Sequence, residues 1–580
     1  MLASRMRLFA PTLPDYDPLE WERMPFERRA KLVCTAWAEQ GYGTPLMIFG
    51  VYLLKIAAFV GGWIGWCSLS PSLGGADELA RWWLEPLAFQ KAIVWSLMFE
   101  VLGLGCASGP LGGRYVPPIG GPTYFLRRKT MKLSMFPGAP LVGGDRRRVW
   151  EVGLYVGLVA GLVHALLAPT MGVREVSPAL VLLVLLTLSD KSVFLAARGE
   201  HYAVTMLVFA LATSEHEWIA GAMVVQAALW FFAGFSKINR HFPAVVGVMI
   251  SNSPVCFPRW IRRRMYRSFP DDLRPSRLAR WMGHSGTGLE LAVPLVLLTA
   301  GSETQLLVGM VLMIALHLFI TSNVPMGVPL EWNVVVVYGA FALFWAHPDV
   351  GVLDMRWPVA VVVLLASVVV PIAGNLWPSK VSFLPSMRYY AGNWAMSVWL
   401  FRGESYRKLA AQIPMSSPWV EDQLARLYDE PTRVGLLGKV MAFRLMHLHG
   451  RVVGMVLDRM LTVPEVGGTR RAGLDEYTWV DGELVAGWVL GWNFGDGHLH
   501  DERLLAAITS ACDFEPGELR CLFVESQPLL GSSLHARVYD AHDGRMFEAH
   551  VPVGDLLARQ PWDLDAPARG LGSSALANRE

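Results

Sequence analysis

Nine ionisable side chains interrupt or open the apolar stretches of this sequence; besides Lys55, Lys91 and Glu100, six of them are its clearest candidates for chemistry. They are Asp190, Lys191, His201, Lys237, Glu290 and His317. Charged groups are costly inside a bilayer, so each of them predicts a functional role. The set combines carboxylates, amines and imidazoles, which are the groups that a buried site for proton or ion chemistry contains.

Each of these residues also has a plain structural interpretation. A lysine at the end of a membrane span usually reaches out to the interface, which accounts for Lys91 and Lys55. Asp190 beside Lys191 could form a local pair in which the two charges neutralise one another. The predicted span order nevertheless places Asp190, His201, Lys237, Glu290 and His317 at a common depth, which favours a shared site.

The elements that must position these residues are membrane-spanning helices. A span needs roughly 20 apolar residues, because its backbone groups must bond within the segment. The sequence offers about ten such stretches. They are 45–69, 86–107, 149–170, 178–197, the shorter run 201–214, 218–237, 286–301, 304–322, 331–347 and 358–376.

Two dense groups of basic residues predict the orientation of these spans. One group lies in 108–148 and the other in 238–285. The positive-inside rule places both in the cytoplasm, which requires an even number of crossings between them. We therefore count 201–214 as a span. The protein is then a multi-pass plasma-membrane protein whose N-terminus and C-terminal domain are both cytoplasmic.

Composition divides the chain in the same way. The apolar fraction is 53% and the charged fraction 17%, and the apolar excess lies before residue 377. The net charge of +2 indicates no acidic partner, and we expect no nucleic-acid binding. We predict an all-α polytopic membrane helix bundle followed by a small α+β soluble domain. The expected parts are a cytoplasmic segment 1–44, a transmembrane domain 45–376, a cytoplasmic domain 377–562 and a disordered tail 563–580.

Local patterns within the C-terminal domain predict its elements. Residues 386–462 favour helices, and a further helix over 501–513 is expected behind a cap at Asp501. Alternating residues on both sides of Asp543 and Gly544 predict a β-hairpin. The polar run GDGHLHDE (495–502) invites a metal interpretation, but it lacks a third ligand at zinc-like spacing. We therefore predict no metal site.

Four segments, in order over 180–345, resemble the vitamin K-dependent gamma-carboxylase-like family, also called horizontally transferred transmembrane (HTTM) domains. The first and second, SDKSVFLAARGEHY and WFFAGFSKIN, match an Asp-Lys pair followed by His, and an Ala-Gly-x-x-Lys motif. The third and fourth match an acidic span and a histidine span. The matching positions are Asp190, Lys191, His201, Tyr202, Ala233, Gly234, Lys237, Ile238, Asn239, Glu290, His317, Asn323 and Gly327. The stretch 383–402 also resembles a bacterial transmembrane family of uncharacterised function.

The resemblance implies a role for each matched residue. In the carboxylases the lysine matching Lys237 deprotonates reduced vitamin K, and the histidine matching His201 assists. A reduced quinone such as menaquinol is therefore the implied cofactor or hydrophobic small-molecule partner, in addition to the lipid bilayer. Asp190 or Glu290 would tune the charge of the site, and His317 would position or shuttle protons.

Two other functions remain open. A transporter or lipid-handling protein would use the same buried charges to line a substrate or proton path. A non-catalytic scaffold would use its spans only to anchor the C-terminal domain. The membrane enzyme accounts best for titratable groups at one depth. Neither the substrate nor the oligomeric state follows from the sequence.

Overall fold

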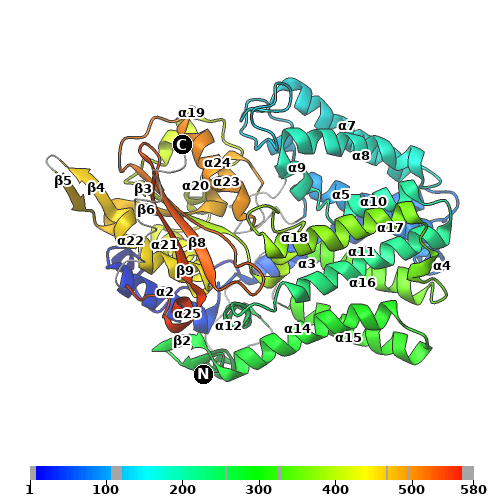
Figure 1. The fold of residues 1–580 in the computed structure, drawn as a ribbon, viewed down its shortest axis with the longest axis horizontal. Coiled ribbons are helices and arrows are strands. Elements are labelled where there is room, and N and C mark those ends of the chain that lie inside the picture. The colour runs from blue at the N-terminus through cyan, green and yellow to red at the C-terminus, as the bar shows by residue number, and fades with distance from the viewer. Residues whose placement is uncertain are drawn as a thin grey trace.

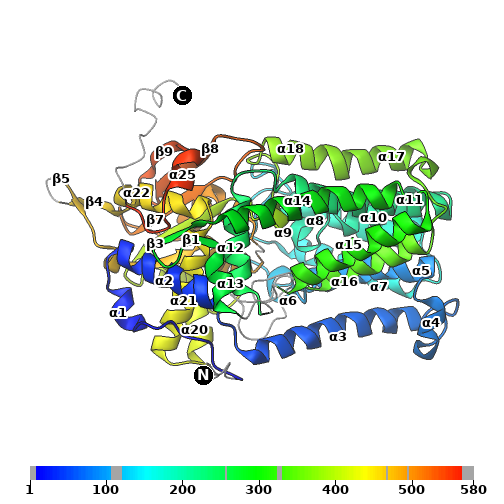
Figure 2. The ribbon, with the colours of Figure 1, turned by 90° about the horizontal axis from the view of Figure 1, so that it is seen from below.

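The computed structural model describes residues 8–105, 121–254, 258–322, 330–465, 468–492 and 495–564. Long helices form a bundle on one side of the molecule, and a β-sheet with shorter helices lies at one end of that bundle (Figures 1 and 2). The predicted disordered tail 563–580 lies, apart from its first two residues, outside the described residues.

Five helical stretches of the bundle are long and apolar enough to cross a membrane. They are α3 (Leu46–Ser68), α7 (Val149–Leu167), α11 (Glu215–Phe235), α15 (Glu303–Thr321) and the stretch Trp357–Leu376, formed by α17 (Trp357–Leu364), η5 (Leu365–Val369) and α18 (Val370–Leu376). A bent helix pair in the C-terminal region would raise the number to six. The protein therefore has the helices of a membrane protein, but the predicted ten spans are not confirmed.

The other predicted spans correspond to helices that are shorter or more polar. They are α5 (Pro86–Val101), α8 (Val173–Ser189) with α9 (Lys191–Ala196), α10 (Tyr202–Leu211), α14 (Arg277–Leu298) and α16 (Leu330–Gly339) with its continuation η3 (Ala340–Trp345). A further short apolar helix, α12 (Phe242–Asn252), lies in the second basic segment, where no span was predicted. The 10 residues of α10 cover about 15 Å, half of a hydrocarbon core of roughly 30 Å. The interpretation of 201–214 as a full span therefore has no support in its length.

Helix burial shows which spans face lipid. In α11, 83% of the apolar window is buried, so this helix occupies the centre of the bundle. In α3 only 11% is buried, and Leu53 and Leu54 are 68% and 71% exposed. A water-soluble protein would not expose such a helix, whereas lipid tails solvate it.

The sheet beyond the bundle has five antiparallel strands in the order β6-β3-β7-β8-β9. Their bounds are β3 (Met396–Arg402), β6 (Tyr477–Asp481), β7 (Leu519–Val524), β8 (Ser533–Asp540) and β9 (Gly544–Pro552). Two small hairpins complete the strands: β1 (Tyr266–Ser268) with β2 (Asp272–Pro275), and β4 (Thr462–Glu465) with β5 (Gly468–Arg471).

Two predictions for this region are confirmed and one is wrong. The hairpin forms, with Asp540 opposite Gly544, whose φ of +82° suits the turn. Asp501 caps α24 (Glu502–Thr509), which ends four residues before the predicted limit. The helical prediction for 386–462 fails at β3, because six of its seven residues are buried and a continuous apolar run shows no strand period.

Helices of the C-terminal region pack around the sheet, and two N-terminal helices pack against one of them. Those of the C-terminal region are α19 (Arg407–Gln412), α20 (Val420–Ala425), α21 (Glu430–Met446), α22 (Val452–Leu461), α23 (Gly482–Val489), α24 and α25 (Val553–Ala558). The N-terminal helices α1 (Pro18–Glu22) and α2 (Phe26–Gln40) pack against α21. Two short helices, α4 (Leu79–Trp82) and α6 (Gly121–Phe125), connect elements of the bundle, and α13 (Arg259–Arg264) lies against α2.

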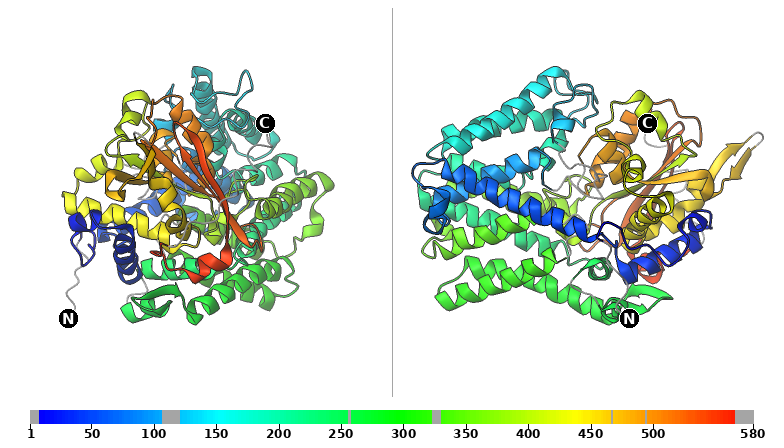
Figure 3. Two further views of the ribbon diagram at one scale, coloured as in Figure 1. Left: turned by 60° about the vertical axis from the view of Figure 1, so that its left-hand side comes forward. Right: turned by 180° about the vertical axis from the view of Figure 1, so that it is seen from behind.

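Both basic segments meet the C-terminal region, at the same end of the bundle. Arg127 donates to the carbonyl of Met415, and Arg503 donates to the carbonyl of Ser134. From the second segment, Arg274 donates to the carbonyl of Ala558. Two further views show the C-terminal region at this end of the bundle (Figure 3). The arrangement agrees with an even number of crossings between the basic segments, and the side of the membrane on which they lie stays a prediction.

Candidate functional site

Lys237 and Glu290 form a buried ion pair at the heart of the predicted site. Lys237 lies just beyond the C-terminal end of α11, and Glu290 lies within α14. The lysine Nζ donates to both carboxylate oxygens, and each residue is only 5% exposed. The Nζ also lies 5.4 Å from the centre of the Phe242 ring. An amine and a carboxylate in direct contact can exchange a proton without any movement of the backbone.

A glycine permits this contact between α11 and α14. A Cβ added at Gly234 would lie 2.9 Å from the Cβ of Glu290 and 3.1 Å from the backbone nitrogen of Leu291. Real side chains do not approach that closely, so any other residue at 234 would push the two helices apart. The Ala-Gly-x-x-Lys pattern therefore has a physical explanation: the glycine sets the distance over which the lysine reaches its partner.

His317, on α15, is held on both ring nitrogens. The Trp230 indole nitrogen lies 2.8 Å from His317 Nε2, and His317 Nδ1 lies 2.7 Å from Asn333 Oδ1. Because an indole can only donate, Nε2 accepts and the ring proton sits on Nδ1. Trp230 is seven residues before Lys237, about two helical turns nearer the start of α11. The imidazole is thus a fixed neutral group with both ring nitrogens occupied.

His201, at the start of α10, lies near His317 through a shared tryptophan. The Trp332 ring centre is 6.3 Å from that of His201 and 6.1 Å from that of His317. His201 is 1% exposed, and its Nδ1 has no hydrogen-bond partner among the described residues. The neighbouring Arg198 pairs with Glu200 at 3.5 Å and has a left-handed φ of +50°. A buried ring nitrogen without a partner can accept a proton or a ligand hydrogen bond.

Asp190 belongs to a different part of the molecule. Its carboxylate pairs with Arg147 at 2.5 Å and accepts from the backbone and hydroxyl of Ser192, so it caps α9. The adjacent Lys191 donates to the carbonyl of His498 in the C-terminal region. Asp190 therefore does not pair with Lys191, and the structure does not bring it into contact with Lys237. Its contacts in this structure are those of a helix cap and an ion pair, and its predicted role in the site stays a prediction.

The residues that follow Gly234 connect the ion pair to the C-terminal region. Ser236 donates to the carbonyl of Met387, and His241 Nε2 lies 2.9 Å from the carbonyl of Ala391. Asn239 bonds the backbone of 527–530 with both its amide nitrogen and its oxygen. Asn239 follows Lys237 by two residues, so these hydrogen bonds link the segment that carries Lys237 to the C-terminal region. Asn323 and Gly327 lie outside the described residues.

A known protein family matches this sequence over nearly its whole length. Residues 6–570 match the family described as "Transmembrane protein of unknown function (DUF3556)". The chain belongs to that family. No curated protein and no solved structure matches it. The uncharacterised transmembrane family expected from the sequence is thereby shown, whereas the resemblance to the carboxylase-like family has no support among these matches.

This DUF3556 chain also has a buried polar cluster that the sequence analysis missed. Arg444 on α21 pairs with Asp481 and Glu483, each at 2.5 Å. Burial raises the pKa of Glu483 to about 7, partly offset by Arg444. His447 and His449 lie beside them with ring centres 5.5 Å apart, and the Nε2 of each lacks a hydrogen bond among the described residues. The motif MHLHGR, with histidines two residues apart, was the available signal.

The run GDGHLHDE serves local structure in the DUF3556 chain. Asp496 accepts from the backbone of His498, whose Nε2 lies 3.1 Å from Glu525, and His500 bonds Ser397 at 2.7 Å. Burial alone would lower the pKa of His498, but the Glu525 carboxylate outweighs it and raises that pKa. The described part of the chain contains no group of three or more His, Cys, Asp or Glu residues able to hold a metal ion.

Proposed function

We propose that this protein is a membrane enzyme that acts on or with a lipid-soluble quinol, with Lys237 as the proton acceptor. The observation that carries the proposal is the buried Lys237–Glu290 pair. The amine and the carboxylate lie in direct contact away from water, so a proton can pass between them and the lysine can accept one from a bound molecule.

The surroundings of the pair support a ligand that arrives from the bilayer. Ile238 and Leu289, each next to one member of the pair, are 37% and 41% exposed on the bundle surface. Leu318, next to His317, is 68% exposed. Apolar side chains at the surface of a membrane bundle face lipid, so a hydrophobic molecule reaches this position without crossing water.

The other predicted residues take narrower roles in the proposal. His201, with its unpartnered Nδ1, is the second proton carrier. His317 positions Trp230, because both its ring nitrogens are already occupied. The similarity of the Ala-Gly-x-x-Lys segment to that of the carboxylase-like family favours a reduced quinone such as menaquinol. We also propose a plasma-membrane location with the N-terminus and the C-terminal region in the cytoplasm.

Mass spectrometry of the lipids that copurify with the protein tests this function. The wild type is compared with Lys237→Met/Glu290→Leu, which removes both charges together. Glu217→Gln/Arg356→Gln is the matched control, because it removes an ion pair at the opposite end of α11. We expect a quinone to be enriched in the wild type and the control but lost from the first variant. An extract that matches bulk lipid in all three would overturn the proposal.

Proton-coupled transport is the second candidate, favoured by another charge pair within the bundle. Lys55 on α3 lies 3.3 Å from Glu331 on α16, so charge extends beyond the Lys237 site. Substrate uptake into proteoliposomes that depends on both Glu290 and Glu331 would support transport. An enzyme would depend on Glu290 alone.

A further inference from the structure

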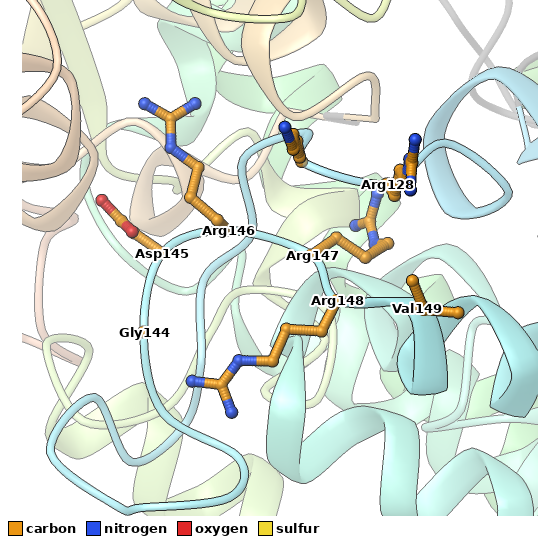
Figure 4. Close-up of a pocket in the computed structure, with 8 residues that line it drawn as sticks. Arg128, Gly144, Asp145, Arg146, Arg147, Arg148 and Val149 are labelled. Carbon is orange, nitrogen blue, oxygen red and sulfur yellow. The ribbon is translucent and has the colours of Figure 1, made fainter.

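A basic pocket opens where the first basic segment meets the start of α7. It has a volume of about 410 Å³ and is lined by Arg128, Lys129, Gly144, Asp145, Arg146, Arg147, Arg148 and Val149. Figure 4 shows Arg146 and Arg148 extending to opposite sides of the turn that precedes α7. Five of the eight lining residues are cationic and one is acidic, so the pocket favours a negatively charged ligand.

Three of these five cationic side chains have no hydrogen-bond or ion-pair partner among the described residues. Arg147 is buried and neutralised by Asp190, and Arg148 donates to the carbonyls of Pro140 and Leu141. The side chains of Arg128, Lys129 and Arg146 form neither a hydrogen bond nor an ion pair with any residue that the structure describes. Free guanidinium groups are suited to phosphate, since they donate two parallel hydrogen bonds to its oxygens.

Backbone bonds hold the pocket in shape before any ligand arrives. The Lys129 nitrogen donates to the Arg147 carbonyl at 2.8 Å, and the Arg147 nitrogen donates to the Thr130 carbonyl at 2.9 Å. A third bond, 3.0 Å long, joins the Lys132 nitrogen to the Asp145 carbonyl. Backbone hydrogen bonds therefore hold the segments that carry Lys129 and Arg146 against one another, so ligand binding does not have to order them.

Exposed apolar residues around the pocket place it at the surface of a bilayer. Val149 and Trp150, which begin α7, are 68% and 39% exposed. Phe136 and Leu141, from the loop before the turn, are 54% and 76% exposed. Aromatic and apolar side chains beside free cations are typical of the headgroup region, where tails solvate one and phosphates pair with the other.

We propose that this pocket binds the phosphate headgroup of an anionic phospholipid. The free cations Arg128, Lys129 and Arg146 would contact the phosphate, while Val149 and Trp150 would lie along the acyl chains. Free inorganic phosphate shares the charge chemistry but not the chains. This site does not include Lys237 or Glu290, so the phospholipid proposal does not depend on the proposed enzyme function.

Native mass spectrometry of the detergent-purified full chain, with equal phosphatidylglycerol and phosphatidylcholine added, tests the proposal. We expect the wild type to bind phosphatidylglycerol in several-fold excess. The triple variant Arg128→Ala/Lys129→Ala/Arg146→Ala should lose that preference. Arg23→Ala/Arg28→Ala/Arg426→Ala is the matched control: it removes the same charge from exposed positions near the C-terminal region and should keep it.

Any of three outcomes, in two kinds of experiment, would overturn the inference. The first two are equal binding of the two lipids by the wild type and an unchanged preference in the pocket variant. The third is full displacement of phosphatidylglycerol by millimolar inorganic phosphate, which would make the site a soluble-anion site. Thermal unfolding of the variant should match that of the wild type, because the three side chains have no described partners to lose.

Discussion

The bundle and the C-terminal region each bury a basic side chain against carboxylates, and the two sites differ in whether the basic group can give up a proton. In the bundle, one lysine meets one glutamate, Lys237 with Glu290. In the C-terminal region, one arginine meets two carboxylates, Asp481 and Glu483. Lysine can give up its proton when desolvated, whereas arginine does not deprotonate in proteins. The first pair can therefore do proton chemistry, while the second is suited to holding structure.

Arg444→Met should have the largest effect on stability. It leaves two buried carboxylates beside one another, of which only one is readily neutralised by a proton, so we expect a loss of about 3–5 kcal/mol. Thermal or denaturant unfolding in detergent measures it. Arg471→Ala is the control, because its pair with Asp458 is more than half exposed and should contribute below about 1 kcal/mol. Equal losses in the two variants would remove the contrast between the regions.

Lys237→Met should cost less than Arg444→Met. The single Glu290 carboxylate left behind can take up a proton, so we expect a loss of about 2–3 kcal/mol. Addition of Glu290→Leu should restore most of the stability, because both charges are then gone. Unfolding of Lys237→Met, Glu290→Leu and the double variant measures the coupling between the two residues. A double variant less stable than Lys237→Met alone would show that the pair is a structural bond like that of Arg444.

Gly234→Ala should destabilise the bundle by about 1–3 kcal/mol, because its new Cβ overlaps the Glu290 side chain. It should also reduce the quinone content expected for the wild type. Gly288→Ala, on the same helix as Glu290, is the control, since an added Cβ there meets nothing within 4 Å. If both alanines were tolerated equally, the close approach of α11 and α14 would not matter for the pair.

The smallest effect should come from the His498–Glu525 pair, because its histidine is charged only when protonated and its contribution therefore depends on pH. His498 lowers the pKa of Glu525 against the effect of burial, so that group stabilises the fold above its ordinary value of 4.5 and loses this as pH falls. The raised pKa of His498 stabilises below 6.5 and is lost as pH rises through the folded value. The stability difference between wild type and Glu525→Gln should therefore peak between pH 5 and 6.5. A difference that grew above pH 8 would contradict this assignment.

Local sequence patterns identified the features that depend on neighbouring residues. Hydropathy indicates the membrane helices because a span needs a continuous apolar segment. The Asp501 cap and the turn at Asp543 and Gly544 were predictable, since each depends on a few consecutive side chains. The predicted ten spans are not confirmed, because helices such as α5, with 16 residues, and α8, with 17 residues, are shorter than the roughly 20 residues that a span needs.

Only the tertiary structure decided which charges meet. Lys237 and Glu290 are 53 residues apart, and nothing between them indicates that they touch. Asp190 was predicted with them, yet the fold gives it to Arg147. Strand β3 was not predicted, because a strand buried on both faces lacks the alternation of apolar and polar residues that indicates a strand. Sequence determines which groups are costly to bury, and long-range packing determines which partner offsets that cost.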